Sequence, residues 1–210
     1  GPKDDLLTFT DDLRWTDFDF LRSGRDDTLT LQVKGTTDQL ILRDFLEEIF
    51  LVGYLNLIEE IQFGDGTKWS YLKLLQHFVD VAKTAGNDTI YGFEGIRDAL
   101  DGGAGDDRLE GLSGGDSYIY GQNYGNDTVL DEGGDDKIIL SGIASGDVDF
   151  SRTALDLIIT VKATGERLVL QNQYVRDDAQ GFAVEYFEFS DRTIAFTDVN
   201  PEDMDLIGGS

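Results

Sequence analysis

Six aspartates recur at nearly fixed intervals in the middle of the chain, and each is followed two places later by a large hydrophobic or aromatic residue. They are Asp88, Asp98, Asp107, Asp116, Asp127 and Asp136. If alternate members lie on the same edge of a folded unit, their carboxylates stack in rows, which repel one another unless a cation lies between them. Carboxylates and the carbonyls of flexible turns are ligands that Ca²⁺ accepts, whereas Mg²⁺ requires near-ideal octahedra. The spacing therefore predicts calcium sites.

The aspartates belong to a nine-residue unit, G-G-x-G-x-D-x-U-x, in which U is a large apolar residue. Gly102–Glu110 fits this unit at every position, and Gly111–Ile119 fits it at all but the second glycine. Glycines permit tight turning, so the first six positions form a loop, and the last three form a short strand that faces a core. Two units then complete one turn of a parallel β-roll. This predicts two stacks, Asp88, Asp107 and Asp127 on one edge and Asp98, Asp116 and Asp136 on the other.

The units resemble the RTX repeats of haemolysin-type calcium-binding proteins, which carry this nonapeptide. The resemblance implies that the sixth-position aspartates and the loop carbonyls of neighbouring coils bind Ca²⁺. It adds four glycines to the expected metal-site residues: Gly86, Gly103, Gly105 and Gly114. The unit around Asp98 departs from the family pattern because Arg97 is inserted beside it. A solvated, glycine-rich linker is the alternative, but a linker does not keep an apolar residue two places after each aspartate.

The segments on either side of the repeats are copies of each other. Alternation at a period of two, with glycine-containing breaks, predicts short antiparallel strands in both. These flanks resemble the region that accompanies RTX repeats in large haemolysin-related secreted proteins. Because the ends of a solenoid expose strand edges and apolar surface, we interpret both flanks as caps that pack onto the roll. The matching stretches are 29–33 with 157–161, 40–42 with 168–170, and 58–67 with 183–193.

The predicted fold is mainly β, a right-handed parallel β-roll of nonapeptide repeats flanked by two β-rich capping units and one amphipathic helix. The helix is expected within 67–83, where apolar residues from Tyr71 to Ala82 recur at helical spacing. The predicted domains are an N-terminal β-rich flanking unit at 6–83, which ends in the helix, the RTX calcium-binding roll at 84–140, and a C-terminal β-rich cap at 141–200.

The composition restricts the possible partners. Among 210 residues there are 42 acidic and 17 basic side chains, a formal net charge of -25, which disfavours binding to nucleic acid or an anionic membrane. The chain has no cysteine, so disulfides, thiol catalysis and zinc–thiolate sites are excluded. No apolar run reaches the roughly 18 residues that a membrane span needs. A strongly acidic chain of this kind suits a protein that binds cations.

An enzymatic function is not expected. The sequence "GLSGG" at 111–115 fits the serine-hydrolase pattern G-x-S-x-G, which needs a following helix and a histidine base. No helical pattern follows Ser113, and the single histidine, His77, is expected on the surface of the predicted helix. Paired carboxylates arise freely in so acidic a chain and do not indicate a glycosidase. Trp15 and Trp69 could stack on sugars, but their positions favour packing.

The expected function is that of a calcium-binding RTX module from a secreted, toxin-related bacterial protein. The resemblance implies export of the parent protein by type I secretion machinery, followed by Ca²⁺-induced folding outside the cell. Extracellular calcium modules bind in the millimolar range, which cytosolic Ca²⁺ does not reach. The alternative is an adhesin or a segment that binds a glycan or cell-surface target, in which Ca²⁺ only makes the fold rigid.

Overall fold

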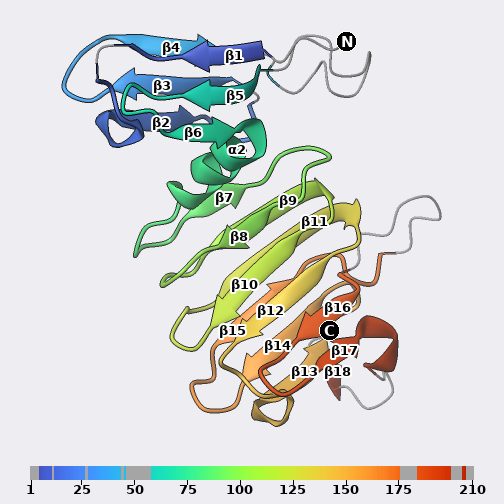
Figure 1. Ribbon diagram of the computed structural model, residues 1–210. Helices are drawn as coiled ribbons and strands as arrows, with labels where there is room; N and C mark the ends of the chain where they lie inside the picture. Colours follow the sequence, from blue (N-terminus) through green and yellow to red (C-terminus); the bar gives the residue numbers. More distant parts are fainter. Residues whose placement is uncertain are drawn as a thin grey trace. The chain divides into compact units, whose positions relative to one another are not determined.

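The computed structural model describes residues 5–10, 12–26, 28–43, 45, 58–175, 184–199 and 205–206. The chain divides into two compact units, residues 1–81 and residues 82–210, which Figure 1 colours from blue to red. Strands make up most of the regular structure in both units, so the prediction of a mainly β protein is confirmed. No helix in the described part is long and apolar enough to cross a membrane.

The N-terminal unit contains two three-stranded sheets. In the first sheet β2 (Phe18–Arg22), β3 (Leu29–Val33) and β4 (Gln39–Leu42) form an antiparallel meander. In the second, β5 (Ile58–Gln62) pairs in parallel with β1 (Asp5–Thr8) and antiparallel with β6 (Lys68–Ser70). A short 3-10 helix, Trp15–Asp17, precedes β2. Because strand side chains alternate between faces, every second residue of β2 and β3 enters the core of this unit: Phe18, Phe20, Leu29 and Leu31.

Helix α2 spans Tyr71–Asp80 and is shorter than the stretch 67–83 in which a helix was expected. It begins after β6, because Trp69 pairs with Ile61 in the sheet and the Ser70 side chain caps the helix by accepting a hydrogen bond from the Lys73 amide at 3.3 Å. Its predicted end was also wrong, since Val81 lies beyond it and is 44% exposed. The amphipathic character is confirmed by one buried face: Leu74, Leu75, Phe78 and Val79.

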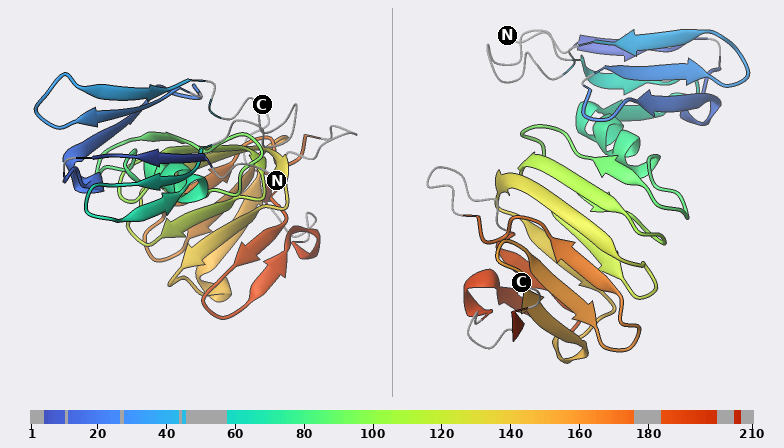
Figure 2. Two further views of the ribbon diagram at one scale, coloured as in Figure 1. Left: turned by 45° about the horizontal axis from the view of Figure 1, so that its top comes forward. Right: turned by 180° about the vertical axis from the view of Figure 1, so that it is seen from behind.

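In the second unit the repeat strands alternate between two sheets that form two layers (Figure 2). One sheet contains β7 (Thr89–Tyr91), β9 (Arg108–Gly114) and β11 (Asp127–Gly134), all parallel. The other contains β8 (Ala99–Asp101), β10 (Ser117–Gly121) and β12 (Lys137–Ser141), also parallel. Each strand therefore pairs with the strand two repeats away, as the nine-residue period predicts.

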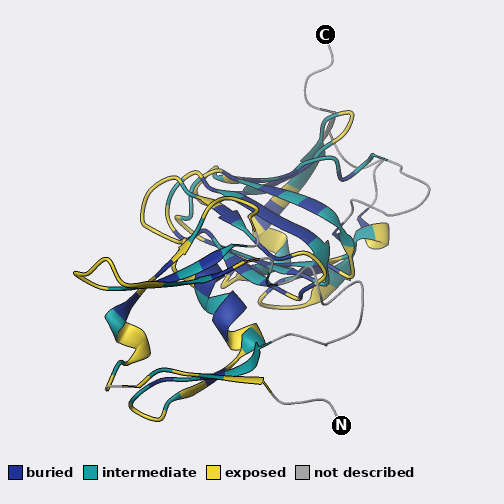
Figure 3. Ribbon diagram, turned by 90° about the horizontal axis from the view of Figure 1, so that it is seen from above, coloured by how far each residue is buried: buried dark blue, intermediate teal, exposed yellow. Residues whose placement is uncertain are grey.

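The apolar residue of each repeat is buried in the core of this unit, and buried positions recur along the ribbon of its strands (dark blue in Figure 3). All six are between 0% and 1% exposed, and fully burying one such side chain stabilises the fold by about 1.5–3 kcal/mol. They are Ile90, Leu100, Leu109, Tyr118, Val129 and Ile138. The interpretation of U as the core position is therefore confirmed, and a disordered linker is excluded for this segment.

The C-terminal copy of the flank continues both of these sheets. Strands β13 (Val148–Arg152), β14 (Leu157–Val161) and β15 (Arg167–Leu170) form an antiparallel meander, and β15 pairs in parallel with β11. On the other layer β16 (Tyr186–Glu188) pairs in parallel with β12 and antiparallel with β17 (Thr193–Ala195). Two further 3-10 helices, Ser145–Asp147 and Phe196–Asp198, and the short strand β18 (Asp205–Leu206) complete the described elements.

The two flanks are copies in register as well as in sequence. Leu29 pairs with Leu42 in the first copy as Leu157 pairs with Leu170 in the second. In both copies a lysine side chain forms a hydrogen bond to the backbone just before the first strand of the meander. Lys34 Nζ donates to the Thr16 carbonyl at 2.8 Å, and Lys162 Nζ donates to the corresponding carbonyl of Gly146 at 2.9 Å. The antiparallel strands predicted for both flanks are thus confirmed, whereas the boundaries 6–83, 84–140 and 141–200 stay a prediction.

Candidate metal centre

The repeat aspartates form the two predicted stacks, here called the first aspartate row (Asp88, Asp107 and Asp127) and the second aspartate row (Asp98, Asp116 and Asp136). In the first row the amide of Asp88 donates to Asp107 Oδ1 at 2.8 Å, and that of Asp107 donates to Asp127 Oδ1 at 2.9 Å. In the second row the amides of Asp98 and Asp116 donate to the next carboxylate at 2.9 and 2.7 Å. One oxygen of each later carboxylate is thereby fixed by the backbone of the preceding turn.

The other oxygen is what makes these carboxylates unusual. Four of them bury Oδ2 with no hydrogen-bond partner among the described residues: Asp107, Asp116, Asp127 and Asp136. The side chains are at most 2% exposed, so water does not solvate these oxygens either. A buried, ionised oxygen without a partner is strongly destabilising. The donor set therefore fits a hard cation such as Ca²⁺.

The electrostatic state of the rows agrees with this interpretation. Burial raises the pKa of Asp116 and of Asp136 to about 8 and that of Asp127 to about 7. Burial also raises the pKa of Asp107 above its ordinary value. Neighbouring carboxylates raise these pKa values further, because like charges disfavour each other's ionisation. Without a cation, Asp116, Asp127 and Asp136 hold protons in the folded state at pH values where isolated aspartates are fully ionised.

Backbone carbonyls stack beside the aspartates, and glycines make the stacking possible. A Cβ at Gly134 would overlap the carbonyl oxygen of Gly114, and one at Gly125 would overlap that of Gly105. Both glycines have positive φ, +155° and +98°, which other residues rarely adopt. The carbonyls of Gly86 and Ile96 lie in the same way against Gly105 and Gly114. Each row thus has a line of carbonyl oxygens next to it, which can serve as further calcium ligands.

The predicted site residues are not equivalent. Asp88, at the start of the first row, accepts hydrogen bonds from the Thr84 amide and hydroxyl at 2.6 and 2.8 Å. Asp98 Oδ2 accepts from the Phe93 amide at 2.6 Å. Gly103 lies against the side chain of Lys83 and outside the two carbonyl stacks. The structure therefore brings together four aspartates with Gly86, Gly105 and Gly114, and the metal-binding role of each stays a prediction.

Two acidic residues at the second row were missed by sequence reasoning. Glu185 extends the row, because the Asp136 amide donates to its Oε2 at 2.7 Å and burial raises its pKa. The signal was present, since Glu185 precedes Phe187 by two places, as each repeat aspartate precedes its apolar residue. Asp131 is buried next to Asp116 and Asp136, and it occupies a position where a complete repeat has glycine.

The serine-hydrolase motif has no catalytic setting. Ser113 lies within β9, and the next element is strand β10, so the strand–turn–helix that the motif requires is absent here. The Ser113 hydroxyl donates to the carboxylate of Glu94. His77 is less exposed than a surface position on the helix would make it. It is half-buried, with its ring centroid 4.4 Å from that of Phe20 and 4.9 Å from that of Trp69, and burial lowers its pKa.

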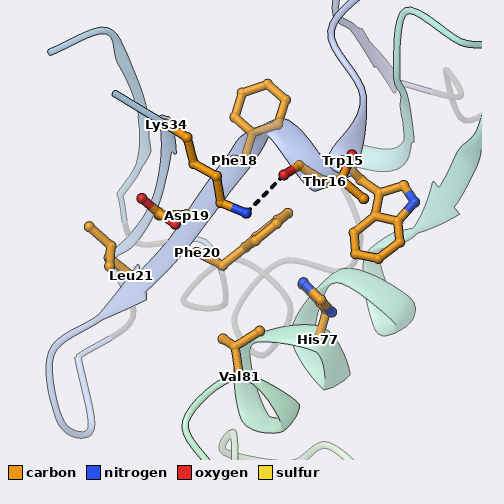
Figure 4. A pocket seen from close by; sticks show the side chains of 9 residues that line it. All are labelled: Trp15, Thr16, Phe18, Asp19, Phe20, Leu21, Lys34, His77 and Val81. Atoms are coloured by element: carbon orange, nitrogen blue, oxygen red, sulfur yellow. Dashed lines mark hydrogen bonds between the residues drawn. The ribbon is translucent and has the colours of Figure 1, made fainter. Parts of the chain in front are cut away.

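The His77 ring also lines an aromatic groove of about 360 Å³ in the N-terminal unit (Figure 4). Trp15 and Phe20 form two of its walls, and Lys34 lies on the opposite side with its Nζ hydrogen-bonded to the Thr16 carbonyl. Trp69 is only 4% exposed, which confirms its packing role, whereas Trp15 is 37% exposed. The groove is therefore a second candidate binding site, separate from the aspartate rows.

The family comparison supports the relationship that the repeats indicate. The model of the haemolysin-type calcium binding protein related domain matches residues 29–71 and 156–194. These two segments are the duplicated flanks, so the match confirms both the duplication and the similarity to RTX-related proteins. The description of this family relates it to haemolysin-type calcium-binding proteins. A search of curated proteins finds no match to this chain.

Proposed function

We propose that the second unit is a calcium-binding β-roll from a secreted bacterial protein, and that it folds on meeting Ca²⁺ after type I secretion. The observation that carries the proposal is the set of four buried Oδ2 atoms without partners, in rows that also have backbone carbonyls stacked beside them. Ca²⁺ supplies the positive charge that these oxygens need in order to be buried as carboxylates. The alternating parallel strands of the two layers support the β-roll topology. The function is one of binding and folding rather than catalysis.

Binding and folding are coupled in this proposal because each site uses oxygens from successive turns. An unfolded chain holds no such site, so the free energy of ion binding becomes free energy of folding. For sites of millimolar affinity, a tenfold excess of Ca²⁺ adds roughly 1.4 kcal/mol per site. Three or four sites contribute about 4–6 kcal/mol, which is comparable with the whole stability of a small domain.

The same coupling supports a secretion role. In a calcium-poor cytosol the carboxylates keep the roll unfolded, which suits passage through a narrow export channel. In a calcium-rich exterior the roll forms, and the C-terminal flank continues both of its sheets and covers their ends. The match to a family related to haemolysin-type calcium-binding proteins agrees with this location.

The test is a calcium titration followed by far-ultraviolet circular dichroism, with Mg²⁺ as the control ion. Both tryptophans, Trp15 and Trp69, lie in the N-terminal unit, so tryptophan fluorescence reports that unit separately. We expect a cooperative coil-to-strand transition with Ca²⁺ and none with Mg²⁺ at the same concentration. The double variant D107N/D116N should weaken the transition, whereas D149N/D198N, which removes two exposed acids outside the rows, should not. Equal strand content in chelator and in Ca²⁺ would contradict the proposal.

A second candidate function, target binding by an adhesin, rests on the aromatic groove. The partly exposed Trp15 ring beside Phe20 offers a flat apolar surface on which a sugar ring can stack. In this case a glycan array should show binding by the calcium-loaded protein and loss of binding in W15A with the fold retained. Glycan binding that W15A leaves unchanged would exclude the groove as the binding site.

A further inference from the structure

Asp131 stands where the other regular repeats have glycine. It comes four places after the repeat aspartate Asp127, as Gly92, Gly102 and Gly111 come four places after theirs. Its side chain is 2% exposed, although the turn that it begins is at the surface of the unit. A glycine is sufficient for this turn elsewhere in the chain, so the loop geometry does not explain a buried carboxylate at this position.

The carboxylate of Asp131 is held in a fixed orientation. Its Oδ1 accepts a hydrogen bond from the Gly133 amide at 2.6 Å, and its Oδ2 accepts one from the Tyr118 hydroxyl at 2.5 Å. The Tyr118 oxygen in turn accepts from the Gly111 amide at 3.0 Å. Tyr118 is the core residue of its own repeat and is 1% exposed, so this chain of hydrogen bonds lies inside the unit.

Two further carboxylates face the same place. One ligand oxygen from each of Asp116, Asp131 and Asp136 lies within 4.8 Å of the other two. The Oδ2 atoms of Asp116 and Asp136 are buried and have no hydrogen-bond partner in the described structure. Asp116 Oδ2 points towards the Tyr118–Asp131 pair, because a Cβ built on Gly111 would touch both this oxygen and the Tyr118 hydroxyl. The three carboxylates thus converge from three elements, the two loops before β10 and β12 and the turn within β11.

This convergence has the dimensions and the charge of a cation site. Calcium–oxygen distances are about 2.3–2.6 Å, so two oxygens on opposite sides of one ion lie roughly 5 Å apart. Three ionised carboxylates buried this close together without a cation would be strongly destabilising. Consecutive members of a row bring only two carboxylates together, and a larger ligand charge increases calcium affinity.

We propose that Asp131 is the third carboxylate ligand of a calcium site shared with Asp116 and Asp136, and that this site fills before the others. The inference rests on the proposed calcium-binding function and goes beyond it, because it names a ligand outside the repeat signature and an order of filling. Tyr118 acts as a positioning residue that holds Asp131 towards the site. The first ion therefore ties the second aspartate row to the interior of the unit, and later ions bind to a partly ordered chain.

The test compares the wild type with D131N in equilibrium dialysis against calcium, with circular dichroism at saturating Ca²⁺ to check folding. We expect D131N to bind one ion fewer at low calcium, with at least a tenfold loss of affinity for the tightest class of sites. D135N is the matched control, since it removes one exposed carboxylate from the same turn, and its binding curve should coincide with that of the wild type. If D131N does not fold, D131G takes its place, because glycine serves the corresponding turns of other repeats.

The outcomes separate the two levels of the proposal. If D131N and the wild type bind the same number of ions with the same affinity, while D107N loses an ion, the role of Asp131 is wrong and the calcium-binding function stands. If the wild type binds no calcium, the proposed function fails and this inference fails with it. An equal loss in D135N would also overturn the inference, because the effect would then come from net charge alone.

Discussion

Acidifying the calcium-free protein is expected to stabilise its second unit, although mild acid destabilises most folded proteins. Burial raises the pKa of Asp116 and of Asp136 to about 8 and that of Asp127 to about 7, whereas the ordinary value is 3.8. The folded state therefore binds protons that the unfolded chain releases. The free energy of unfolding falls as the pH rises from 3.8 through about 8, and it recovers as the pH is lowered through the same window.

Asp116 gives the size of the effect. With a folded-state pKa of about 8 and an ordinary value of 3.8, this carboxyl destabilises the calcium-free fold at pH 7 by about 4 kcal/mol. Between pH 7 and pH 5 each such carboxyl returns about 1.4 kcal/mol per pH unit. The contributions of the three aspartates interact and do not simply add. One of them alone is still a large part of the 5–15 kcal/mol that stabilises a typical domain.

The assay is far-ultraviolet circular dichroism at pH 7, 6 and 5 in buffers from which a chelating resin has removed calcium, with urea unfolding at each pH where the second unit has strand structure. The matched control is the triple variant D116N/D127N/D136N, which keeps the side-chain shape but has no proton to bind at these positions. We expect the stability of the wild type to rise towards pH 5 and that of the variant to change much less. A wild type that is equally or less stable at pH 5, or a variant with the same slope, would refute the reasoning.

Three further predictions concern a glycine beside a stacked carbonyl, the acid that extends the second aspartate row, and the core of the N-terminal unit. The variant G134A should prevent calcium-induced folding, because its Cβ would overlap the Gly114 carbonyl, whereas G142A, at φ +70° with nothing within 4 Å, should lose only about 1–2 kcal/mol in calorimetry. E185Q should raise the calcium concentration at the midpoint of the circular-dichroism transition, because it removes the negative charge next to Asp136 at the end of the second aspartate row. Its control E188Q removes only a surface ion pair with Lys137, which is worth less than about 1 kcal/mol. L74A should destabilise the N-terminal unit by about 2–5 kcal/mol in tryptophan-monitored unfolding, at any calcium concentration, because Leu74 is fully buried there.

The sequence was sufficient to predict the central part of the fold. A period of nine residues with one apolar position determines which strands pair, so the alternation between two sheets and the two aspartate rows follow from the repeat pattern alone. The duplicated flanks were equally predictable, because Leu29 and Leu157 begin the same alternating pattern and occupy the same register. Local periodicity carries this information because neighbouring repeats contact each other.

Sequence reasoning failed where contacts between distant segments decide the outcome. Trp69 lies in the stretch 67–83 where a helix is expected from the sequence, but pairing with Ile61 places it in a strand. His77 was expected on the surface because its chain neighbours are polar, yet Phe20 and Trp15 cover it from another part of the N-terminal unit. Asp131 was missed because it stands at a glycine position of the nonapeptide, and only the fold brings it to the second row. Glu185 was missed because its segment keeps only the acid and the apolar residue two places later.

The most direct test of the account is a crystal structure from protein grown in millimolar Ca²⁺, with the anomalous signal used to locate the ions. Anomalous peaks are expected beside the buried Oδ2 atoms of both rows, those of Asp107, Asp116, Asp127 and Asp136, with loop carbonyls completing the coordination. An ordered second unit whose four Oδ2 atoms have no ion beside them would contradict the claim that calcium stabilises it.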